Sequence, residues 1–367
     1  ECDRLPLELI RRLPKADLHH HLDGSIRVST IIDIAKKNNV LLPTYEEDEL
    51  RKIIQVGDDC MSLEDYLKAF LFTHSIMQDE ESLERCMYEV CQDSFNDGVC
   101  YLEVRFAPCL HNLGGLANEQ VINSVLRGKN RAENDFDGFH SRIIVCGIRS
   151  DTPTKVLEMA RLVDQYMGTG VVAFDIAGPE YGFRPDIHHE AFECVQHGLH
   201  FCTCHAGEAD GPESVRSALK QGAHRIGHGV RIRDDPDLLT YIINHRVPVE
   251  MCVTSNLQTK AVVSVLDHPI YEFLQKDVVV VPCTDNTLMS GITLSGEYKK
   301  IADHFHLTFN ELERLLMNGF ESSFNPDREL KMRICEDART KIRKILSECF
   351  EGDEVCESCV LKSSKSK

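Results

Sequence analysis

The chain has 367 residues, of which 42% are hydrophobic, and its 41 basic and 59 acidic residues give it a formal charge of −18. This hydrophobic content can fill one large α/β core or two smaller ones. The negative charge repels a phosphate backbone, so we predict no nucleic-acid partner. No run approaches the roughly 20 apolar residues that cross a bilayer, and residues 1–14 lack the pattern of a secretory signal. We therefore expect no membrane association and a cytoplasmic location, although a chain that begins at Glu1 leaves open a targeting segment ahead of it.

The chain contains 16 cysteines, which are scattered through predicted strands and helices. They do not cluster in a short, loop-rich segment of the kind that disulfides stabilise. We therefore interpret them as free thiols, most of them buried.

Short β-branched runs alternate with longer stretches of helical periodicity along most of the chain. This alternation predicts parallel strands that are joined by crossover helices. We predict eight strands, at residues 15–22, 99–106, 141–148, 171–176, 200–204, 225–227, 248–253 and 277–282. Helical patterns between them cover residues 62–76, 82–96, 154–167, 185–197, 212–221, 236–245 and 268–275.

Eight strand and helix units predict an α/β fold, a (β/α)₈ TIM barrel. A doubly wound open sheet is the structural alternative. We expect a single barrel domain over residues 1–348, in which residues 25–98 form a helical insertion after the first strand and act as a lid. Residues 349–367 are polar, and we predict that they form a disordered tail.

Histidines and carboxylates gather where four of the predicted strands end. In a barrel, these strand ends lie on the face that carries active sites. The first strand ends in His19, His20 and His21, and because side chains alternate along a strand, His19 and His21 share one face. The other three ends hold the motifs His205-Ala-Gly-Glu208, Gly-His228-Gly and Thr-Asp285-Asn286.

Three imidazoles and a carboxylate form a ligand set that suits a borderline cation such as zinc. A site that leaves one coordination position to water lowers the pKa of that water toward neutrality. A single histidine at a strand end is more often a hydrogen-bonded structural residue. Four such motifs at four strand ends nevertheless predict a metal centre on this face of the barrel.

These motifs resemble the adenosine deaminase family of metal-dependent adenosine and adenine deaminases, over residues 13–324. The resemblance rests on Pro14-Lys-Ala-Asp-Leu-His-His-His-Leu-Asp-Gly-Ser25, on the motifs at residues 205–208 and 227–229, and on residues 101–105, 175–178 and 250–252. It implies one Zn²⁺ per chain, bound by His19, His21, His205 and Asp285. It also implies that Glu208, His228 and Asp285 are the catalytic residues.

The chemistry of hydrolytic deamination agrees with these roles. Hydroxide attacks the carbon that bears the amine while a proton reaches the adjacent ring nitrogen. We predict that Glu208 donates this proton to N1 of a purine, and that His228 orients the attacking water and stabilises the developing charge. The sequence leaves open whether His228 is also a general base. The alternative for Glu208 is an exposed carboxylate at the start of a helix.

The resemblance also implies contacts with the substrate. The backbone amide of Gly178 is expected to face N3 of the purine, and Asp23 is expected to accept a hydrogen bond from a ribose hydroxyl. Family members that act on the free base tend to carry glutamate at the position of Asp23, so aspartate favours a nucleoside. A helical gate on the ribose side would be formed by Leu63, Tyr66, Leu67 and Phe70. An apolar stripe of this kind is ordinarily part of a core, and that alternative stays open.

The chain departs from the commonest family pattern at Asn286, where that pattern has a second consecutive aspartate. This position is expected to bond purine N7, which is an acceptor. An aspartate must be protonated to donate to N7, whereas an amide donates at any pH. Asparagine therefore fits the contact, but it leaves open a different substrate preference.

The predicted function is zinc-dependent hydrolytic deamination of adenosine and 2'-deoxyadenosine to inosine and 2'-deoxyinosine, with release of ammonia. The predicted partner is thus a small-molecule purine nucleoside. The alternative is a related purine aminohydrolase that acts on adenine, an N6-substituted adenylate or a modified nucleoside. A third hypothesis is a protein that chiefly binds a receptor or acts as a secreted growth factor. The sequence does not predict the oligomeric state.

Overall fold

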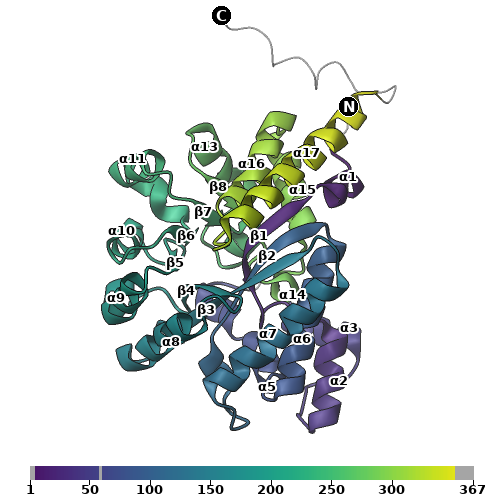
Figure 1. The fold of residues 1–367 in the computed structure, drawn as a ribbon, viewed down its shortest axis with the longest axis vertical. Coiled ribbons are helices and arrows are strands. Elements are labelled where there is room, and N and C mark those ends of the chain that lie inside the picture. Colours follow the sequence, from purple (N-terminus) through teal and green to yellow (C-terminus); the bar gives the residue numbers. More distant parts are fainter. Residues whose placement is uncertain (1–4, 58–59, 352–367) are drawn as a thin grey trace, which may run out of the picture.

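Eight parallel strands form one sheet that curls into a barrel within the residues that the computed structural model describes, 5–57 and 60–351 (Figure 1). Each strand pairs with the next one along the chain. The ends of the sheet meet where the backbone of Asp285 bonds to that of His19 and His21. The strands are β1 (Lys15–His21), β2 (Val99–Phe106), β3 (His140–Ile148), β4 (Val171–Ala177), β5 (Phe201–Ala206), β6 (Arg225–His228), β7 (Val249–Met251) and β8 (Val280–Pro282). The predicted (β/α)₈ barrel is confirmed.

Helices follow the strands and surround the barrel (Figure 1). Those between β2 and β8 are α7 (Asn118–Asp135), α8 (Pro153–Tyr166), α9 (His189–His197), α10 (Pro212–Lys220), α11 (Pro236–Asn244), α12 (Val253–Gln258) and α13 (Ile270–Gln275). Before β1 lies α1 (Leu7–Arg12), and after β8 come α14 (Thr287–Ser290), α15 (Leu294–Phe305), α16 (Phe309–Glu321) and α17 (Arg328–Glu351). In the described residues, none of the helices combines the length and the apolar character needed to cross a membrane.

Several helices begin where the sequence supplies a start signal. Proline is the first residue of α8, α10 and α11, where its missing N–H is not needed by the helix. The Asp235 side chain accepts hydrogen bonds from the first turn of α11. Such local signals explain why the helical patterns in this part of the chain correspond to real helices.

The segment between β1 and β2 contains five helices, which Figure 1 draws together beside α7. They are α2 (Val28–Asn38), α3 (Glu47–Ile54), α4 (Leu63–Leu67), α5 (Phe70–Ile76) and α6 (Glu80–Asn96). Arg27, at the start of α2, forms an ion pair with Asp93 of α6. The single-domain organisation and the role of residues 25–98 as a lid stay predictions.

Two predicted elements differ from the structure. The helix expected at residues 62–76 is divided into α4 and α5, because the chain between them makes tighter bonds to the third residue back, such as Lys68 N–H to the Asp65 carbonyl. The strand expected at residues 248–253 ends at Met251. Buried Glu297 accepts a hydrogen bond from the N–H of Thr254 and so favours the start of α12 there.

The last helix, α17, continues to Glu351, three residues beyond residue 348. The domain boundary at 348 stays a prediction. The rest of the predicted tail, residues 352–367, lies outside the described residues.

A buried lysine connects α1 to the first residue of β1. Lys15 is fully buried, and its ammonium group donates to the backbone carbonyls of Ile10 and Leu13, each at 2.8 Å. Carbonyls at the end of a helix carry partial negative charge and lack partners within the helix, so they favour a cation. Burial nevertheless lowers the pKa of Lys15 to about 8.

The stability contribution of Lys15 is therefore expected to depend on pH. Because its folded-state pKa of about 8 lies below the unfolded value of 10.5, the unfolded chain binds more protons between these two pH values. The free energy of unfolding of the wild type, relative to that of Lys15→Met, should rise between pH 8 and pH 10.5, by at most about 3 kcal/mol. Equilibrium denaturant unfolding of both proteins at several pH values measures this. A difference that stays constant or falls over this window would contradict the assignment.

Candidate active site

The carboxyl ends of β1, β5, β6 and β8 bring the predicted reactive side chains to one mouth of the barrel. His19 and His21 project from the same face of β1, and His19 is fully buried. The ring of His20 instead contacts the Asp17 carboxylate, at 3.1 Å, and the Thr284 hydroxyl, at 3.0 Å. The alternation of side chains along β1 thus separates His20 from its two neighbours.

One potential ligand atom from each of His19, His21, His205 and Asp285 lies within 4.8 Å of the others. The Nε2 atoms of His21 and His205 are 3.1 Å apart. Oδ1 of Asp285 lies 3.4 Å from Nε2 of His19 and 3.3 Å from Nε2 of His21. The structure therefore brings these four residues together from three distant parts of the chain.

This donor set fits a divalent cation. The Nε2 atom of His19 is buried and has no hydrogen-bond partner, which is unusual for a polar atom that does not bind a ligand. Burial lowers the pKa of His21 to about 3, so its imidazole is neutral, as metal binding requires. For Asp285, burial alone would raise the pKa, but the nearby imidazoles, His19 first, outweigh burial and hold that pKa well below its usual value.

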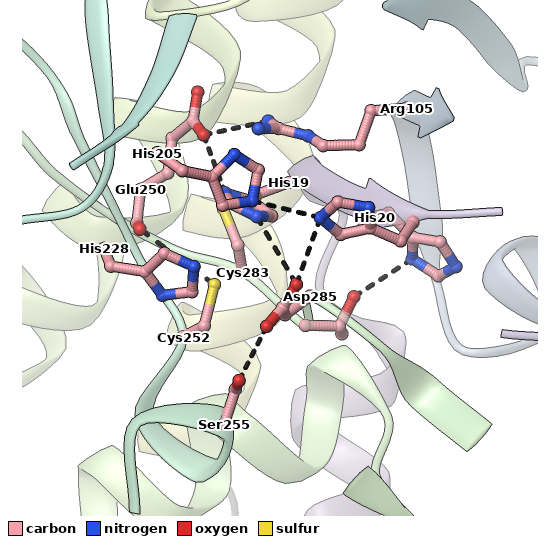
Figure 2. Close-up of polar contacts among 12 residues, drawn as sticks. His19, His20, Arg105, His205, His228, Glu250, Cys252, Ser255, Cys283 and Asp285 are labelled. Atoms are coloured by element: carbon pink, nitrogen blue, oxygen red, sulfur yellow. Dashed lines mark hydrogen bonds and ion pairs between the residues drawn. The ribbon is translucent and has the colours of Figure 1, made fainter. Parts of the chain in front are cut away.

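Buried carboxylates orient two of these imidazoles. Glu250 accepts a hydrogen bond from Nδ1 of His19 at 2.8 Å, and Asp175 lies 2.9 Å from Nδ1 of His205. Arg105 lies 2.8 Å from each of the two carboxylates, and Figure 2 shows its contact with Glu250. Nδ1 of His19 is hydrogen-bonded and Nδ1 of His205 lies beside a carboxylate, so Nε2 of each ring is the atom that faces the centre.

The oxygen atoms of Asp285 are divided between two tasks. Ser255 donates a hydrogen bond to Oδ2 at 2.6 Å, and Oδ1 faces the histidines (Figure 2). The backbone of Asp285 has a φ of 65°, and His228 has a φ of 64°. Left-handed backbone is costly for residues other than glycine and is often found at functional sites.

The carboxylate of Glu208 lies beside His228. Its Oε2 atom is 3.5 Å from Nε2 of His228, while Oε1 accepts from the hydroxyl of Thr259 at 2.9 Å and the amide of Asn256 at 3.2 Å. Glu208 is 4% exposed. The structure therefore does not support the alternative of an exposed carboxylate at a helix start.

The loop that carries Glu208 is held by a second carboxylate. Buried Glu180, which follows β4, accepts four backbone N–H groups of residues 207–210, at 2.6–3.1 Å. Four donors around one carboxylate form a compact anion-binding nest. The turn after β4, which contains Gly178, is thereby tied to the turn after β5.

The residues predicted to bind the sugar lie near one another. Oδ2 of Asp23 is 2.7 Å from Nε2 of His74, and its other oxygen, Oδ1, is buried without a partner. The ring of Phe70 lies 5.7 Å from that of His74 and 6.3 Å from that of Tyr66. These aromatic residues on α4 and α5 make a continuous wall from Tyr66 to Asp23.

Two residues of the predicted gate are less clearly placed. Leu63 is half-buried at the first position of α4. Leu67 is also half-buried and packs against the main hydrophobic core. Tyr66 and Phe70 are members of that same core, so the alternative of a core stripe stays open for the predicted gate.

The residues predicted to contact the base follow β4 and β8. Gly178 has a φ of 101°, and a side-chain Cβ there would meet nothing closer than 3.6 Å. Asn286 is buried, and its Oδ1 lies where a Cβ of Gly24 would be. The Tyr66 hydroxyl, 2.8 Å from that of Ser290, lies close to the Asn286 amide.

Sequence reasoning assigned no role to several residues of this site, although three of them lie in segments that carry the family resemblance. They are Arg105, Asp175, Glu180, Glu250, Ser255, Asn256, Thr259, His268 and His74. A usable signal existed for the first two and for Glu250, because a charged residue inside an otherwise apolar strand must have a buried partner. No local signal marks the others, whose contacts come from distant segments.

Comparison with known proteins gives consistent matches. A family model described as adenosine deaminase matches residues 14–340. A probable adenosine deaminase of Dictyostelium discoideum is 43% identical over 93% of this chain and 44% of its own length, so the chain spans less than half of that relative. An adenosine deaminase of Clostridium kluyveri is 39% identical over 86% of this chain and 91% of its own length. The crystal structure of an arabidopsis N6-mAMP deaminase superimposes with a TM-score of 0.81 at 26% identity, covering 91% of this chain and 99% of that one.

The two neighbouring histidines of β1 provide a matched test of the metal centre. His21→Gln should lose most of its bound metal, because Nε2 of His21 is one of the four converging atoms. His20→Gln should keep the metal, because that ring contacts Asp17 and Thr284 instead. Metal content of both purified variants, measured by elemental analysis against the wild type, tests this. Equal metal content in the two variants would contradict the proposed ligand set.

Proposed function

This chain belongs to the adenosine deaminase family of hydrolases, and we propose that it converts adenosine and 2'-deoxyadenosine to inosine and 2'-deoxyinosine with release of ammonia. One observation carries the proposal. The converging atoms of His19, His21, His205 and Asp285 lie at the same barrel mouth as Glu208. A cation site beside a buried carboxylate is the arrangement that hydrolytic deamination requires.

The family is metal-dependent, and we propose that this chain holds one Zn²⁺ between the three histidines and Asp285. Three nitrogen donors and one carboxylate oxygen suit zinc. When bound, the cation lowers the pKa of a coordinated water toward neutrality. The part of the protein is to orient the imidazoles of His19 and His205, through Glu250 and Asp175.

Glu208 is the proposed proton donor to N1 of the purine. Its Oε1 accepts two hydrogen bonds, from Thr259 and Asn256. A proton on this carboxyl group therefore belongs on Oε2, which has no such donors and faces His228 at 3.5 Å. Protonation of N1 withdraws electrons from the carbon that bears the amine and favours attack on it.

Two further groups are proposed to position the base. The N–H of Gly178 is assigned to N3, since its open left-handed turn lets the backbone approach a ligand closely. The amide of Asn286 is assigned to N7, since its oxygen is directed at Gly24 and its nitrogen has two protons, one for the neighbouring Tyr66 hydroxyl and one for a ligand acceptor.

Asp23 supports a nucleoside rather than a nucleotide. Burial alone would raise its pKa, but the hydrogen bond and charge of His74 outweigh burial and lower the pKa of Asp23 to about 2. Asp23 is therefore a carboxylate at neutral pH, with Oδ1 buried and unpaired. Such an oxygen accepts a hydrogen bond from a ribose hydroxyl but repels a phosphate.

The alternative substrates are adenine, an N6-substituted adenylate or a modified nucleoside. The arabidopsis structure, described as an N6-mAMP deaminase, covers 91% of this chain and so favours the adenylate among them. His74 and His111, whose rings are 5.8 Å apart, both lie near Asp23 at the proposed sugar end. The negative charge of Asp23 there favours the nucleoside over a phosphorylated substrate.

We also propose a cytoplasmic location. Eleven cysteines of the described part of the chain, spread from Cys86 to Cys335, are free thiols. Free thiols persist in a reducing compartment, whereas secreted proteins tend to form disulfides. A small purine is the proposed partner, and the net charge of −18 argues against a polynucleotide.

A substrate panel tests the proposed specificity. We expect purified, zinc-loaded protein to release ammonia from adenosine and 2'-deoxyadenosine, and to act much more slowly on AMP, N6-methyl-AMP and adenine. Asp23→Asn should lower kcat/KM for adenosine by about 10-fold to 100-fold, because a charged hydrogen-bond acceptor is lost. Preferred turnover of a nucleotide by the wild type would instead support the alternative. Ammonia release and absorbance change measure both.

The role of Glu208 is tested by Glu208→Gln, which keeps the size of the side chain but removes its transferable proton. We expect kcat to fall by about 100-fold to 10,000-fold while zinc remains bound. Glu213→Gln is the matched control, since Glu213 is an exposed carboxylate in the first turn of the next helix. Near-normal kcat in Glu208→Gln would rule out this proton donor. A role in receptor binding, the third hypothesis, should survive both substitutions.

A further inference from the structure

Asn256 lies at the junction of the two proposed catalytic side chains. It is fully buried on α12. Its amide nitrogen is 3.2 Å from Oε1 of Glu208 and 3.0 Å from Nδ1 of His228. Its amide oxygen is 3.1 Å from Nε2 of His268. One amide therefore contacts three titratable side chains.

The His268 end determines the orientation of this amide. Nδ1 of His268 accepts a hydrogen bond from the backbone N–H of Ile270, so a neutral ring carries its proton on Nε2. Burial lowers the pKa of His268 to about 3, which keeps the ring neutral. A protonated Nε2 needs an acceptor, and Oδ1 of Asn256 is that acceptor.

The Glu208 end requires the same orientation independently. Oε1 of Glu208 also accepts the Thr259 hydroxyl, so the atom of Asn256 that faces it must be a donor. The amide nitrogen has two protons, and its two neighbours are Glu208 Oε1 and His228 Nδ1. Each receives one of them. Both ends of the amide thus agree on which atom is oxygen and which is nitrogen.

We propose that Asn256, held by His268, is a positioning residue that keeps Nδ1 of His228 unprotonated and directs the proton of His228 to Nε2. His228 then meets the reaction as a hydrogen-bond donor, with no free ring nitrogen on the side of the active site to act as a base. The same amide occupies Oε1 of Glu208, so the reactive proton of Glu208 is on Oε2. The part of this inference that concerns catalysis depends on the proposed deaminase function.

The sequence leaves open whether His228 is also a general base, and this arrangement makes it a hydrogen-bond donor instead. Nε2 of His228 and Oε2 of Glu208 are 3.5 Å apart. When Glu208 is protonated, both atoms are donors, and each must find its own acceptor in the reacting molecules. When Glu208 has lost its proton, Nε2 of His228 can donate to the carboxylate instead. His228 needs no change of protonation state in either case.

The tautomer of His228 is measured directly by NMR of the zinc-loaded protein with ¹⁵N-labelled histidine, and His228→Gln identifies its signals by their disappearance. We expect wild-type His228 to show an unprotonated Nδ1 and a protonated Nε2. A protonated Nδ1 would overturn the inference. This readout needs no substrate, so a wild type that shows the expected tautomer but does not deaminate adenosine would refute the proposed function alone.

Substitutions then connect the tautomer with catalysis. Asn256→Asp replaces the amide donor by an acceptor, so Nδ1 of His228 should become protonated and kcat should fall by about 100-fold or more, with a smaller effect on KM. His268→Gln can still donate to Oδ1 of Asn256 and should keep most of kcat and the wild-type tautomer. His268→Leu cannot donate, and we expect a lower kcat with a mixture of tautomers. If His268→Leu and Asn256→Asp both kept the wild-type kcat and the wild-type His228 signal, the positioning role would be overturned.

Discussion

Arg105 lies between Asp175 and Glu250 in the interior of the barrel, and all three side chains are fully buried. An ion moved from water into a protein interior costs several kcal/mol unless it is paired. Each carboxylate here also contacts a proposed ligand, Asp175 with His205 and Glu250 with His19. Glu250 is also paired with buried Arg225, at 2.6 Å, so the charge balance of the barrel and the orientation of two imidazoles depend on two guanidinium groups.

The strands of the barrel position the side chains of the site, and the turns after the strands provide left-handed backbone conformations that a strand cannot adopt. His228 and Asp285 both have left-handed backbone, where a side chain other than glycine is strained by about 1–3 kcal/mol. Such turns persist only when their surroundings hold them. For the turn after β5, Glu180 provides this support through four backbone N–H groups. For Asp285, backbone bonds to β1 do so, and these same bonds close the barrel.

The sequence predicted the parts of this protein that depend on local patterns. Alternation of strands and helices predicted the barrel, and the alternation of side chains along β1 separated His20 from His19 and His21. The supporting residues could not be predicted in the same way. Asn256 acts through segments 48, 28 and 12 residues away, and nothing in its own neighbourhood differs from an ordinary helix start. The strand predicted through residue 253 also hid it, because α12 begins there.

The donors and acceptors around the proposed base form a consistent set. N1, N3 and N7 of an aminopurine are all acceptors, and the groups assigned to them are Glu208, the Gly178 amide and Asn286. The two amides donate hydrogen bonds at any pH, whereas Glu208 can donate only while it carries its proton. After it gives up its proton, its Oε2 becomes an acceptor, while the purine N1 has become a donor, so the contact survives with its direction reversed. Nε2 of His228, 3.5 Å away, can stabilise the new carboxylate because Asn256 keeps its proton on that nitrogen. The orientation of the Asn256 amide thus suits both the protonated Glu208 that meets the substrate and the carboxylate that remains after the proton has been transferred.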